Sequence, residues 1–399
     1  MMSDEKHYKN FLDENLFPRV LKNIEFITSS DSVAHIYYQG RQLINFSSTD
    51  YLGLARHPLL IARSQEYAKH YGVGSTSSRL VSGNLAIYEQ LEQQLAKAVG
   101  KPAALILGTG YQANISILEA LLDPKILGAE PLVFSDRNCH VSLLSNTQHL
   151  AKLMRFQHND LDHLQTLLEK YAASDQAKFI LVESVYSMDG DQADLVRIAS
   201  LAKQYQAMLY VDDAHAVGIY GATGWGLASD QAHDIDFVMG TFSKALGSHG
   251  AYIACSETMR HYLINKCRGL IYSTGLSPAV LGAMAGAIEL MPRLAQERLS
   301  LLKKAKTVRQ FFIEHGLDYG DSNTHIIPWI IGDAEKTLLI SQLLEEQGIL
   351  ATAIRPPSVP YNKSRIRFCL SAAHSEADMN QLMQAVCFIG KKLNLFGSE

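Results

Sequence analysis

The sequence has no surplus of positive charge, no long apolar run and few cysteines. Its 36 Lys and Arg residues are scattered against 40 Asp and Glu, a net charge of −4, which argues against a nucleic-acid partner. No apolar run approaches the ~18 residues of a transmembrane helix, so no membrane partner is expected. Residues 1–6 are charged and lack the apolar segment of a signal peptide. These absences favour a cytoplasmic protein.

Cysteine spacing excludes further classes. The five cysteines are widely separated and include no C-x-x-C pair, so neither a zinc site nor a dithiol redox motif is indicated. Reduced thiols in a cytoplasmic chain are the simplest interpretation. The 399 residues, of which 47% are apolar and 19% charged, suit a globular protein with one large domain and a smaller companion.

Short apolar strands alternate with helices between about residues 55 and 290. The predicted strands are 103–107, 132–134, 179–183, 208–211, 237–240 and 252–255. The predicted helices are 86–99, 112–122, 161–171 and 195–205. Strands that are apolar on both faces are typical of a mostly parallel sheet covered by helices. We therefore expect an α/β domain that binds its ligand at the carboxyl ends of the strands.

The two ends of the chain have a different pattern. The first 54 residues predict a helix with Phe11, Leu16 and Val20 on one side, then a hairpin over 35–46 with Gly40 in its turn. After a helical stretch at 277–315, the predicted strands and helices are 324–331, 334–347, 349–353, 365–370 and 376–393. We expect an N-terminal segment, a large domain and a smaller α+β domain, with bounds 1–54, 55–292 and 293–399.

Lys244 follows an apolar run and stands among Ser, Gly and Ala residues. Small neighbours let a cofactor approach the backbone. A half-buried lysine can lose its proton near neutral pH, because burial disfavours the charged amine. An uncharged amine is what a Schiff base with an aldehyde cofactor requires. On this motif alone, a lysine that ends a strand in solvent is the more common alternative.

A glycine-rich turn joins a predicted strand to a predicted helix at Gly108-Thr-Gly110-Tyr-Gln-Ala113. Such a turn predicts a phosphate site, because glycine allows close approach and the N–H groups of a helix N-terminus bind anions. The same letters fit the dinucleotide fingerprint, although no acidic residue clearly ends a second strand ~20 residues later. A nicotinamide dehydrogenase and a turn without a ligand therefore stay open as alternatives.

Polar residues also follow other predicted strands. Asp212 could keep a pyridinium nitrogen protonated, which makes the ring an electron sink, and His215 could bind its phenolic oxygen. His140 could stack on the ring and transfer protons, and Ser187 could donate to the same oxygen. Singly, each is also explained as polar surface at a strand end. A metal pair at Asp212 and His215 lacks further ligands, so no metal is expected.

Arg365 and Arg367 alternate along a predicted strand, so both leave the same face. A planar guanidinium suits a substrate carboxylate, and an exposed basic strand face is the alternative. Together, the phosphate turn, ring-nitrogen acid, stacking group and lysine are the parts of a pyridoxal-phosphate site. Their conjunction favours that site over the separate alternatives, including a binding protein that kept the fold without the cofactor.

A series of segments in chain order resembles the α-oxoamine synthases, which are pyridoxal-phosphate enzymes with the aspartate-aminotransferase-type fold. The matching segments span nearly the whole chain: 45–53, 72–83, 155–160, 187–191, 211–218, 241–244 and 271–274. The resemblance implies a fold-type I architecture and a homodimer with its active site at the subunit interface. It also implies a decarboxylative condensation of an amino acid with an acyl thioester, carried by coenzyme A or a carrier protein.

The resemblance also implies roles for individual residues. Lys244 would form the Schiff base with pyridoxal 5'-phosphate and remove the Cα proton. Around the ring, it implies stacking by His140, pairing with the nitrogen by Asp212, and contacts to the 3-oxygen by Ser187 and His215. Phosphate contacts would come from Gly110, Tyr111 and Thr241, and from Thr274 of the partner subunit.

Substrate choice depends on the C-terminal segments 353–360 and 365–374. They resemble the members that condense L-alanine with a pimeloyl thioester in biotin biosynthesis. Members that use glycine, such as glycine C-acetyltransferase, usually differ in the Arg-Pro-Pro part and remain the alternative. Arg367 would bind the amino-acid carboxylate and Ser358 would line the pocket. Thr49 occupies a position near the substrate where the family usually has asparagine, so a direct contact from Thr49 is left open.

Overall fold

The computed structural model describes residues 5, 7–10, 21–26 and 33–396, so the predicted helix side with Phe11, Leu16 and Val20 lies outside the described residues. Strands β1 (Ile24–Phe26), β2 (His35–Tyr38) and β3 (Arg41–Asn45) form an antiparallel sheet. Gln39 and Gly40, with φ of 50° and 73°, make the two-residue turn of the predicted hairpin. Strand β12 (Ile349–Leu350) pairs with β3 in parallel, so the N-terminal hairpin joins the C-terminal part of the chain.

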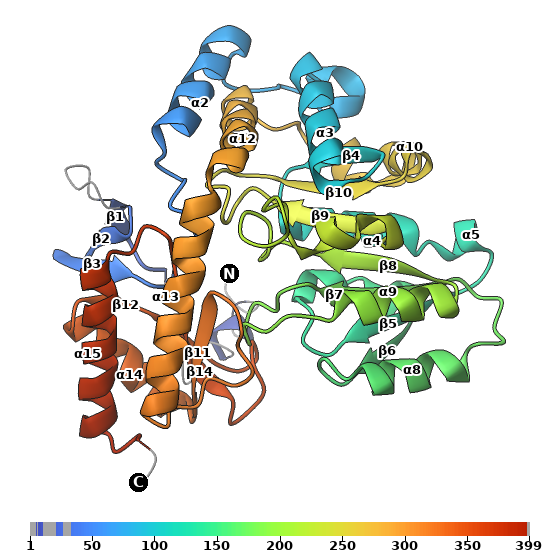
Figure 1. Ribbon diagram of the computed structural model, residues 1–399. Coiled ribbons are helices and arrows are strands. Elements are labelled where there is room, and N and C mark those ends of the chain that lie inside the picture. The colour runs from blue at the N-terminus through green and yellow to red at the C-terminus, as the bar shows by residue number, and fades with distance from the viewer. Residues whose placement is uncertain (1–4, 6, 11–20, 27–32, 397–399) are drawn as a thin grey trace.

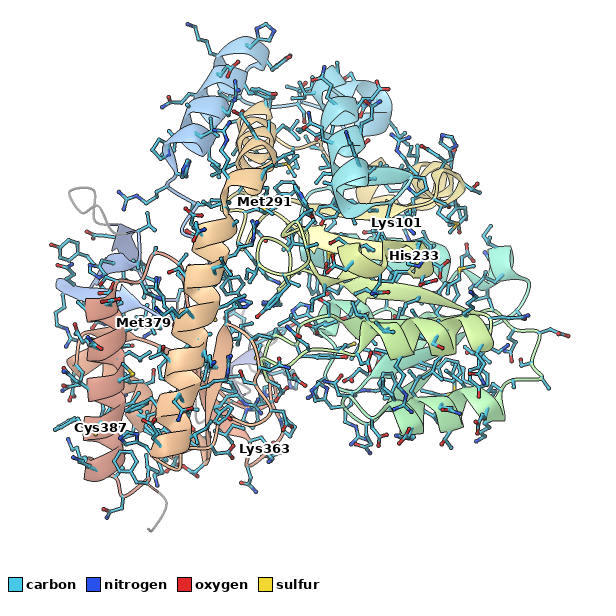
Figure 2. The ribbon with its side chains drawn as sticks, viewed as in Figure 1. Lys101, His233, Met291, Lys363, Met379 and Cys387 are labelled. Atoms are coloured by element: carbon cyan, nitrogen blue, oxygen red, sulfur yellow. The ribbon has the colours of Figure 1, made fainter. Side chains whose placement is uncertain are left out.

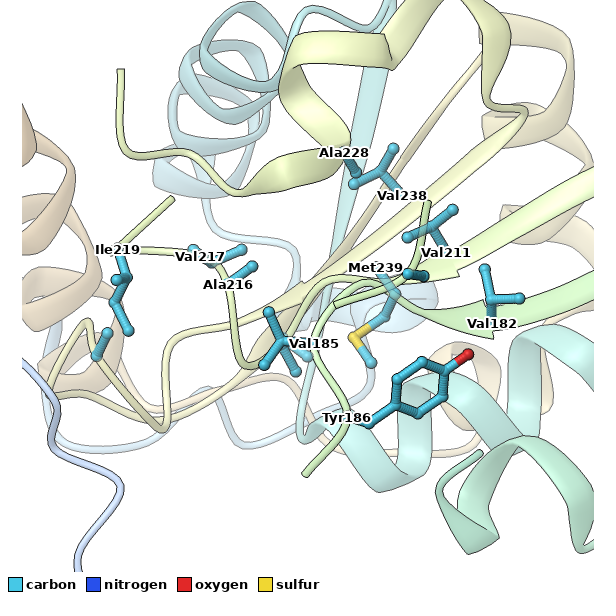
Figure 3. Packing of buried hydrophobic residues seen from close by; sticks show 14 of the residues in the cluster. Val182, Val185, Tyr186, Val211, Ala216, Val217, Ile219, Ala228, Val238 and Met239 are labelled. Atoms are coloured by element: carbon cyan, nitrogen blue, oxygen red, sulfur yellow. The ribbon is translucent and has the colours of Figure 1, made fainter. Parts of the chain in front are cut away.

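The central sheet has seven strands in the order β4-β10-β9-β8-β7-β5-β6. Only β10 is antiparallel to its neighbours, which confirms the predicted mostly parallel sheet. Figure 3 shows Val182, Val211 and Val238 side by side on three successive strands, in register. The bounds are β4 (Ala103–Leu107), β5 (Leu132–Asp136), β6 (Lys152–Phe156), β7 (Lys178–Glu183), β8 (Ala207–Asp212), β9 (Phe237–Thr241) and β10 (Ala251–Cys255).

Helices cover this sheet and begin where polar side chains cap them. Thr109, Asp160 and Asp194 each accept a hydrogen bond from a backbone N–H in the first turn of the helix that follows. In Figure 1, α8 and α9 lie side by side along the sheet. The helices of this part are α3 (Ala86–Val99), α4 (Gly110–Leu121), α5 (Pro124–Leu127), α6 (Val141–Leu144), α7 (Thr147–Leu150), α8 (Leu161–Lys170), α9 (Leu195–Gln204), α10 (Glu257–Lys266), α11 (Arg268–Ile271), and the shorter turns η1 (Arg79–Gly83) and η2 (Leu227–Asp234).

A helical path connects the large sheet to the C-terminal part. Helix α12 (Pro278–Leu290) packs closely against α2 (Pro58–Tyr71), because Gly282 has no Cβ where one would lie 2.3 Å from the carbonyl oxygen of Arg63. The path continues through η3 (Met291–Arg293) into α13 (Ala295–Glu314), and Figure 2 labels Met291 at this junction. The division of the chain at residues 54 and 292 stays a prediction.

The C-terminal part is a second α+β unit. Strands β11 (Ile326–Gly332), β14 (Ser364–Cys369) and β13 (Thr352–Ile354) form an antiparallel sheet next to α14 (Ala334–Glu346), and α13 packs against α15 (Glu376–Lys392). The prediction of one strand over 349–353 is wrong. Buried β12 pairs with β3, whereas β13 turns away to pair with β14, so the segment serves two sheets. No helix of the described residues is both long and apolar enough to cross a membrane.

Candidate active site

Three adjacent parallel strands end in polar residues that lie together. Glu183 ends β7 and is the register partner of Asp212 at the end of β8, while Thr241 ends β9. All three are buried, with 2%, 6% and 3% of their surface exposed. Strand β4 has the same direction as these strands, because β10 is antiparallel to both β4 and β9. The glycine-rich turn after β4 therefore opens onto the same edge of the sheet.

Asp212 is held through both carboxylate oxygens. The side-chain amide of Asn114 donates to Oδ2 at 2.8 Å, and the backbone N–H of Ala214 donates to Oδ1 at 3.0 Å. A buried carboxylate with fixed orientation is suited to hold a protonated ring nitrogen. This agrees with the role that the sequence predicted for Asp212.

Lys244 lies in a tight turn that follows β9. Gly247 donates its backbone N–H to the carbonyl of Lys244 at 2.9 Å, and Ser243 donates its own to Thr241 Oγ1 at 3.1 Å. Burial lowers the pKa of the Lys244 amine and nearby Arg367 adds to the effect, while Asp212 and Glu183 oppose it. The amine is therefore easier to deprotonate than a lysine in water, as a Schiff base requires.

His215 is buried against Tyr51. Its Nδ1 lies 2.8 Å from the Tyr51 hydroxyl. Burial lowers the pKa of His215 well below its usual value, and the positive charges of Lys244 and Arg367 add to this. The imidazole is neutral, so one of its two nitrogens carries a proton and the other can accept, and the Tyr51 hydroxyl is the partner of Nδ1.

His140 stands at the N-terminus of α6, where its Nδ1 accepts from the N–H of Ser142 at 3.3 Å and lies 2.7 Å from the Ser142 hydroxyl. Its backbone N–H donates to the carboxylate of Glu183. Burial lowers the pKa of the imidazole and Lys244 lowers it further, whereas Asp212 raises it. The ring of Tyr111 meets that of His140 edge-on, with centroids 6.5 Å apart.

The predicted phosphate residues surround the first turn of α4. A Cβ added to Gly110 would lie 4.0 Å from the Cβ and Oγ1 of Thr241, so the turn faces the end of β9. Tyr111, at 52% exposure, is the solvent-facing member of this group. The arrangement joins a helix N-terminus, a glycine and a hydroxyl, which fits an anion.

Thr274 is exposed and forms an antiparallel bridge with Ser78. Its neighbour Ser273 accepts a hydrogen bond of 2.6 Å from Gln112, in the first turn of α4 of the same chain. The segment of Thr274 thus adjoins the phosphate end of the site. Whether the Thr274 hydroxyl serves this site or that of a partner subunit stays a prediction.

The two arginines of β14 have different surroundings. Arg365 is buried and pairs with Asp189, Nη1 to Oδ1, at 2.6 Å, and also donates to the carbonyl of Met188. Arg367 donates to the carbonyl of Ser187 at 3.2 Å and, among the described residues, forms no ion pair with a carboxylate. Ser187 itself is buried. Arg367 is thus the better candidate for a substrate carboxylate, and the alternative of an exposed basic face is wrong for Arg365.

Two predicted substrate residues lie on loops. Thr49 is partly buried and its carbonyl accepts from the N–H of Tyr51 at 2.9 Å. Ser358 is exposed and its N–H donates to the carbonyl of Arg355, just after the cis Pro356-Pro357 bond. Their contacts with substrate stay predictions.

Three further site residues have no assigned role in the sequence reasoning. Glu183 accepts from His140, and burial beside Asp212 raises its pKa well above the usual range, against the opposing charge of Lys244. Asn114 orients Asp212, and Tyr51 contacts His215. Glu183 could have been found, because it ends an apolar strand as Asp212 does. Asn114 lies on the buried face of α4, and its partner Asp212 is 98 residues away in the sequence.

Comparisons with known proteins agree with this geometry. The model of the family "Aminotransferase class I and II" matches residues 41–386. A protein of Paramagnetospirillum magneticum, provisionally named 8-amino-7-oxononanoate synthase, is 48% identical over 94% of each chain. The 8-amino-7-oxononanoate synthase of Gluconacetobacter diazotrophicus is 43% identical, again over 94% of each. A serine palmitoyltransferase variant from S. paucimobilis with bound pyridoxal phosphate and myriocin superposes with a TM-score of 0.89, at 26% identity, over 98% of this chain and 97% of that one.

The chain therefore belongs to the class I and II aminotransferase family, and the predicted fold-type I architecture is confirmed. Within that family it is an α-oxoamine synthase, a pyridoxal-phosphate-dependent enzyme of the acyltransferase type. It is similar to the 8-amino-7-oxononanoate synthases. A nicotinamide dehydrogenase based on the glycine-rich turn is thereby set aside.

Proposed function

We propose that the enzyme condenses L-alanine with a pimeloyl thioester and releases carbon dioxide and the free thiol carrier. The product would be 8-amino-7-oxononanoate, in biotin biosynthesis. The observation that carries the proposal is that Lys244, Asp212, His140 and His215 meet at one sheet edge, near Arg367 of β14, in a chain 48% identical to a relative of that name.

The residues present fit pyridoxal phosphate. Asp212 would hold the ring nitrogen, His140 would stack on the ring, and Ser187 and His215 would contact its 3-oxygen. The turn at Gly110 and Tyr111, with Thr241 opposite, would hold the phosphate. When bound, the cofactor supplies an electron sink for negative charge at the Cα of the amino acid.

Side chains of the protein would transfer the proton and orient the substrate. The Lys244 amine, whose pKa is lowered, takes a proton from Cα and can return it. Arg367 orients the carboxylate of alanine by its planar guanidinium. Neutral His215 would bind a ligand oxygen through its imidazole without adding a charge.

A homodimer is part of the proposal. Val73 and Val81 are 80% exposed and Tyr272 is 77% exposed, and the backbone pairing of Ser78 with Thr274 brings their segments together. Large apolar side chains exposed next to a site are typical of a surface that a partner covers. We propose that a second copy covers them and that its Thr274 reaches the phosphate. A cytoplasmic location is proposed as well, with the thioester carried by coenzyme A or by a carrier protein.

Purified protein tests the cofactor and the substrate separately. We expect a visible absorption band that borohydride removes, which marks a lysine-linked aldehyde. We then expect release of carbon dioxide with L-alanine and pimeloyl thioester at a kcat/KM far above that with glycine and acetyl thioester. A preference for glycine would favour glycine C-acetyltransferase instead.

Mixed dimers test the subunit arrangement. A dimer of one Lys244→Ala subunit and one Thr274→Ala subunit contains one site with its own lysine and the partner's native threonine. If Thr274 acts across the interface, that site is intact and has about half the activity of a native dimer. If Thr274 acts within its own subunit, the one site with a lysine is impaired, and the mixed dimer has about half the activity of the Thr274→Ala homodimer.

A further inference from the structure

Asn114 lies where three buried polar groups meet. It is 1% exposed, on the inner face of α4. One end of its side chain lies 2.8 Å from the Tyr210 hydroxyl. The other end lies 2.8 Å from Asp212 Oδ2 and 2.9 Å from Ser142 Oγ. The amide therefore connects the group for the ring nitrogen with the residue that contacts His140.

The donors and acceptors around Asn114 determine the orientation of its side-chain amide. An ionised Asp212 can only accept, so the end of Asn114 that faces it must be the NH₂ group. The carbonyl end then faces Tyr210, whose pKa burial raises well above its usual value, so its hydroxyl keeps its proton and donates. Both N–H groups of Asn114 are used, one on Asp212 and one on Ser142.

The orientation passes on to His140. Since Ser142 Oγ accepts from Asn114, its own proton is available to donate to His140 Nδ1, 2.7 Å away. The backbone N–H of Ser142 also points to Nδ1, at 3.3 Å. Two donors on one nitrogen leave no room for a proton there, so the neutral imidazole carries its proton on Nε2.

We propose that Asn114 is a positioning residue that holds the Asp212 carboxylate and, through Ser142, keeps the proton of His140 on Nε2. The inference rests on the proposed function for the meaning of both groups, but the hydrogen-bond chain itself is independent of the substrate. As a consequence, Asn114 orients both Asp212 and His140, the two residues proposed to contact the cofactor ring. The charged groups that face the His140 imidazole are Asp212 and Lys244, and the backbone N–H of His140 donates to the side chain of Glu183.

The direct test is nitrogen NMR of protein labelled with ¹⁵N-histidine, without substrate. In the native protein at neutral pH we expect the His140 signals, assigned with His140→Gln, to be those of the neutral Nε2–H form. In Ser142→Ala the Nδ1-protonated fraction should rise, and in Asn114→Leu it should rise too. Tyr210→Phe is the matched control, because it removes the far hydroxyl but leaves both donors of Asn114 in place.

The affinity for pyridoxal phosphate tests the contact between Asn114 and Asp212. Asn114→Leu should weaken pyridoxal-phosphate binding about tenfold, the scale of one hydrogen bond to a charged group, whereas Ser142→Ala should change it less than about twofold. An Nδ1–H form in the native protein, or unchanged histidine signals in Ser142→Ala, would overturn the proposal. Should Asn114→Leu not fold, Asn114→Ala and Asn114→Ser, which also remove the donors to Asp212 and Ser142, take its place, and unchanged histidine signals in them overturn the proposal. If the enzyme proves to use another substrate, the NMR result is unaffected, so the two failures can be told apart.

Discussion

Two histidines at the same sheet edge, partly buried His158 and buried His215, differ in charge. His158 lies between two carboxylates, with Nδ1 2.9 Å from Asp136 and Nε2 2.9 Å from Asp191. Burial opposes its charged form, but the bonds to both carboxylates outweigh this and raise its pKa to about 10. His215 is buried, and burial lowers its pKa well below the usual value, with the positive charges of Lys244 and Arg367 adding to the effect.

The comparison teaches that burial favours the neutral imidazole and that hydrogen-bonded carboxylates on both ring nitrogens can reverse this. The charged His158 connects the ends of β5 and β6 to the loop that carries Ser187 and Asp189, and Asp189 in turn pairs with Arg365. The neutral His215 is left for chemistry. The contacts of His158 thus hold loops in position, whereas the region of His215 can bind a ligand and transfer protons.

Replacing Lys244, the cation beside His215, tests the catalytic role of the His215 region and should have the largest effect. Lys244→Ala should abolish measurable turnover, because the covalent anchor and the Cα base are both lost. It should also raise the pKa of His215, since Lys244 is one of the charges that lower it. Steady-state assays and histidine NMR titration check these expectations. Turnover near the native rate would refute the assignment, and an unchanged melting temperature would show that the fold is intact.

Removing the cation of the other region should affect stability. His158→Gln leaves Asp136 and Asp191 without their charged partner, at a cost of ~3 kcal/mol in the free energy of unfolding. His149→Gln, an exposed histidine, is the matched control and should change it little. Urea unfolding at pH 6.5 measures both. Equal stability of the two variants would mean that His158 is not charged in the folded protein.

The same variant gives a pH dependence. The pKa of His158 is about 10 when folded and ~6.5 when unfolded, so its contribution is complete below ~6.5 and is lost as pH rises toward 10. The difference in unfolding free energy between native protein and His158→Gln should therefore shrink steadily from pH 6.5 to pH 10. A difference that grows over this range would contradict the assigned charge.

The two arginines of β14 extend this comparison, because Arg365 forms a structural ion pair and Arg367 is the candidate for substrate binding. Arg367→Lys should weaken alanine binding by about 1–3 kcal/mol, because lysine keeps the charge but not the planar pair of donors. Arg365→Lys should instead reduce stability and change alanine affinity less, since Arg365 pairs with Asp189. Alanine titrations followed by absorbance, with melting curves, separate the two. If Arg365→Lys has the larger effect on alanine, the carboxylate site is misassigned.

The smallest expected effect is at position 49. Thr49→Asn restores the residue that the family usually has near the substrate and should change alanine affinity or single-turnover rate by ~1 kcal/mol, one neutral hydrogen bond. Cofactor affinity should stay the same. If neither alanine affinity nor rate changes, Thr49 is outside the contact distance of the substrate.

Local sequence predicted most of the central part. The predicted strands and helices lie within a few residues of their predicted bounds, but the edge strand β6 (Lys152–Phe156), which is only partly buried, was not among them. Parallel strands bring their carboxyl ends to one edge, so Lys244, Asp212, His140 and His215 could be expected to meet there.

Only the tertiary structure decided what packing across the chain controls. It split 349–353 between two sheets, gave Arg365 a carboxylate partner from 176 residues away, and placed Asn114 against Asp212. It also decided that His158 is charged whereas His215 is neutral. The physical reason is that burial and the charge of a neighbour set hydrogen-bond direction and pKa, and neither is encoded in the local pattern of residues.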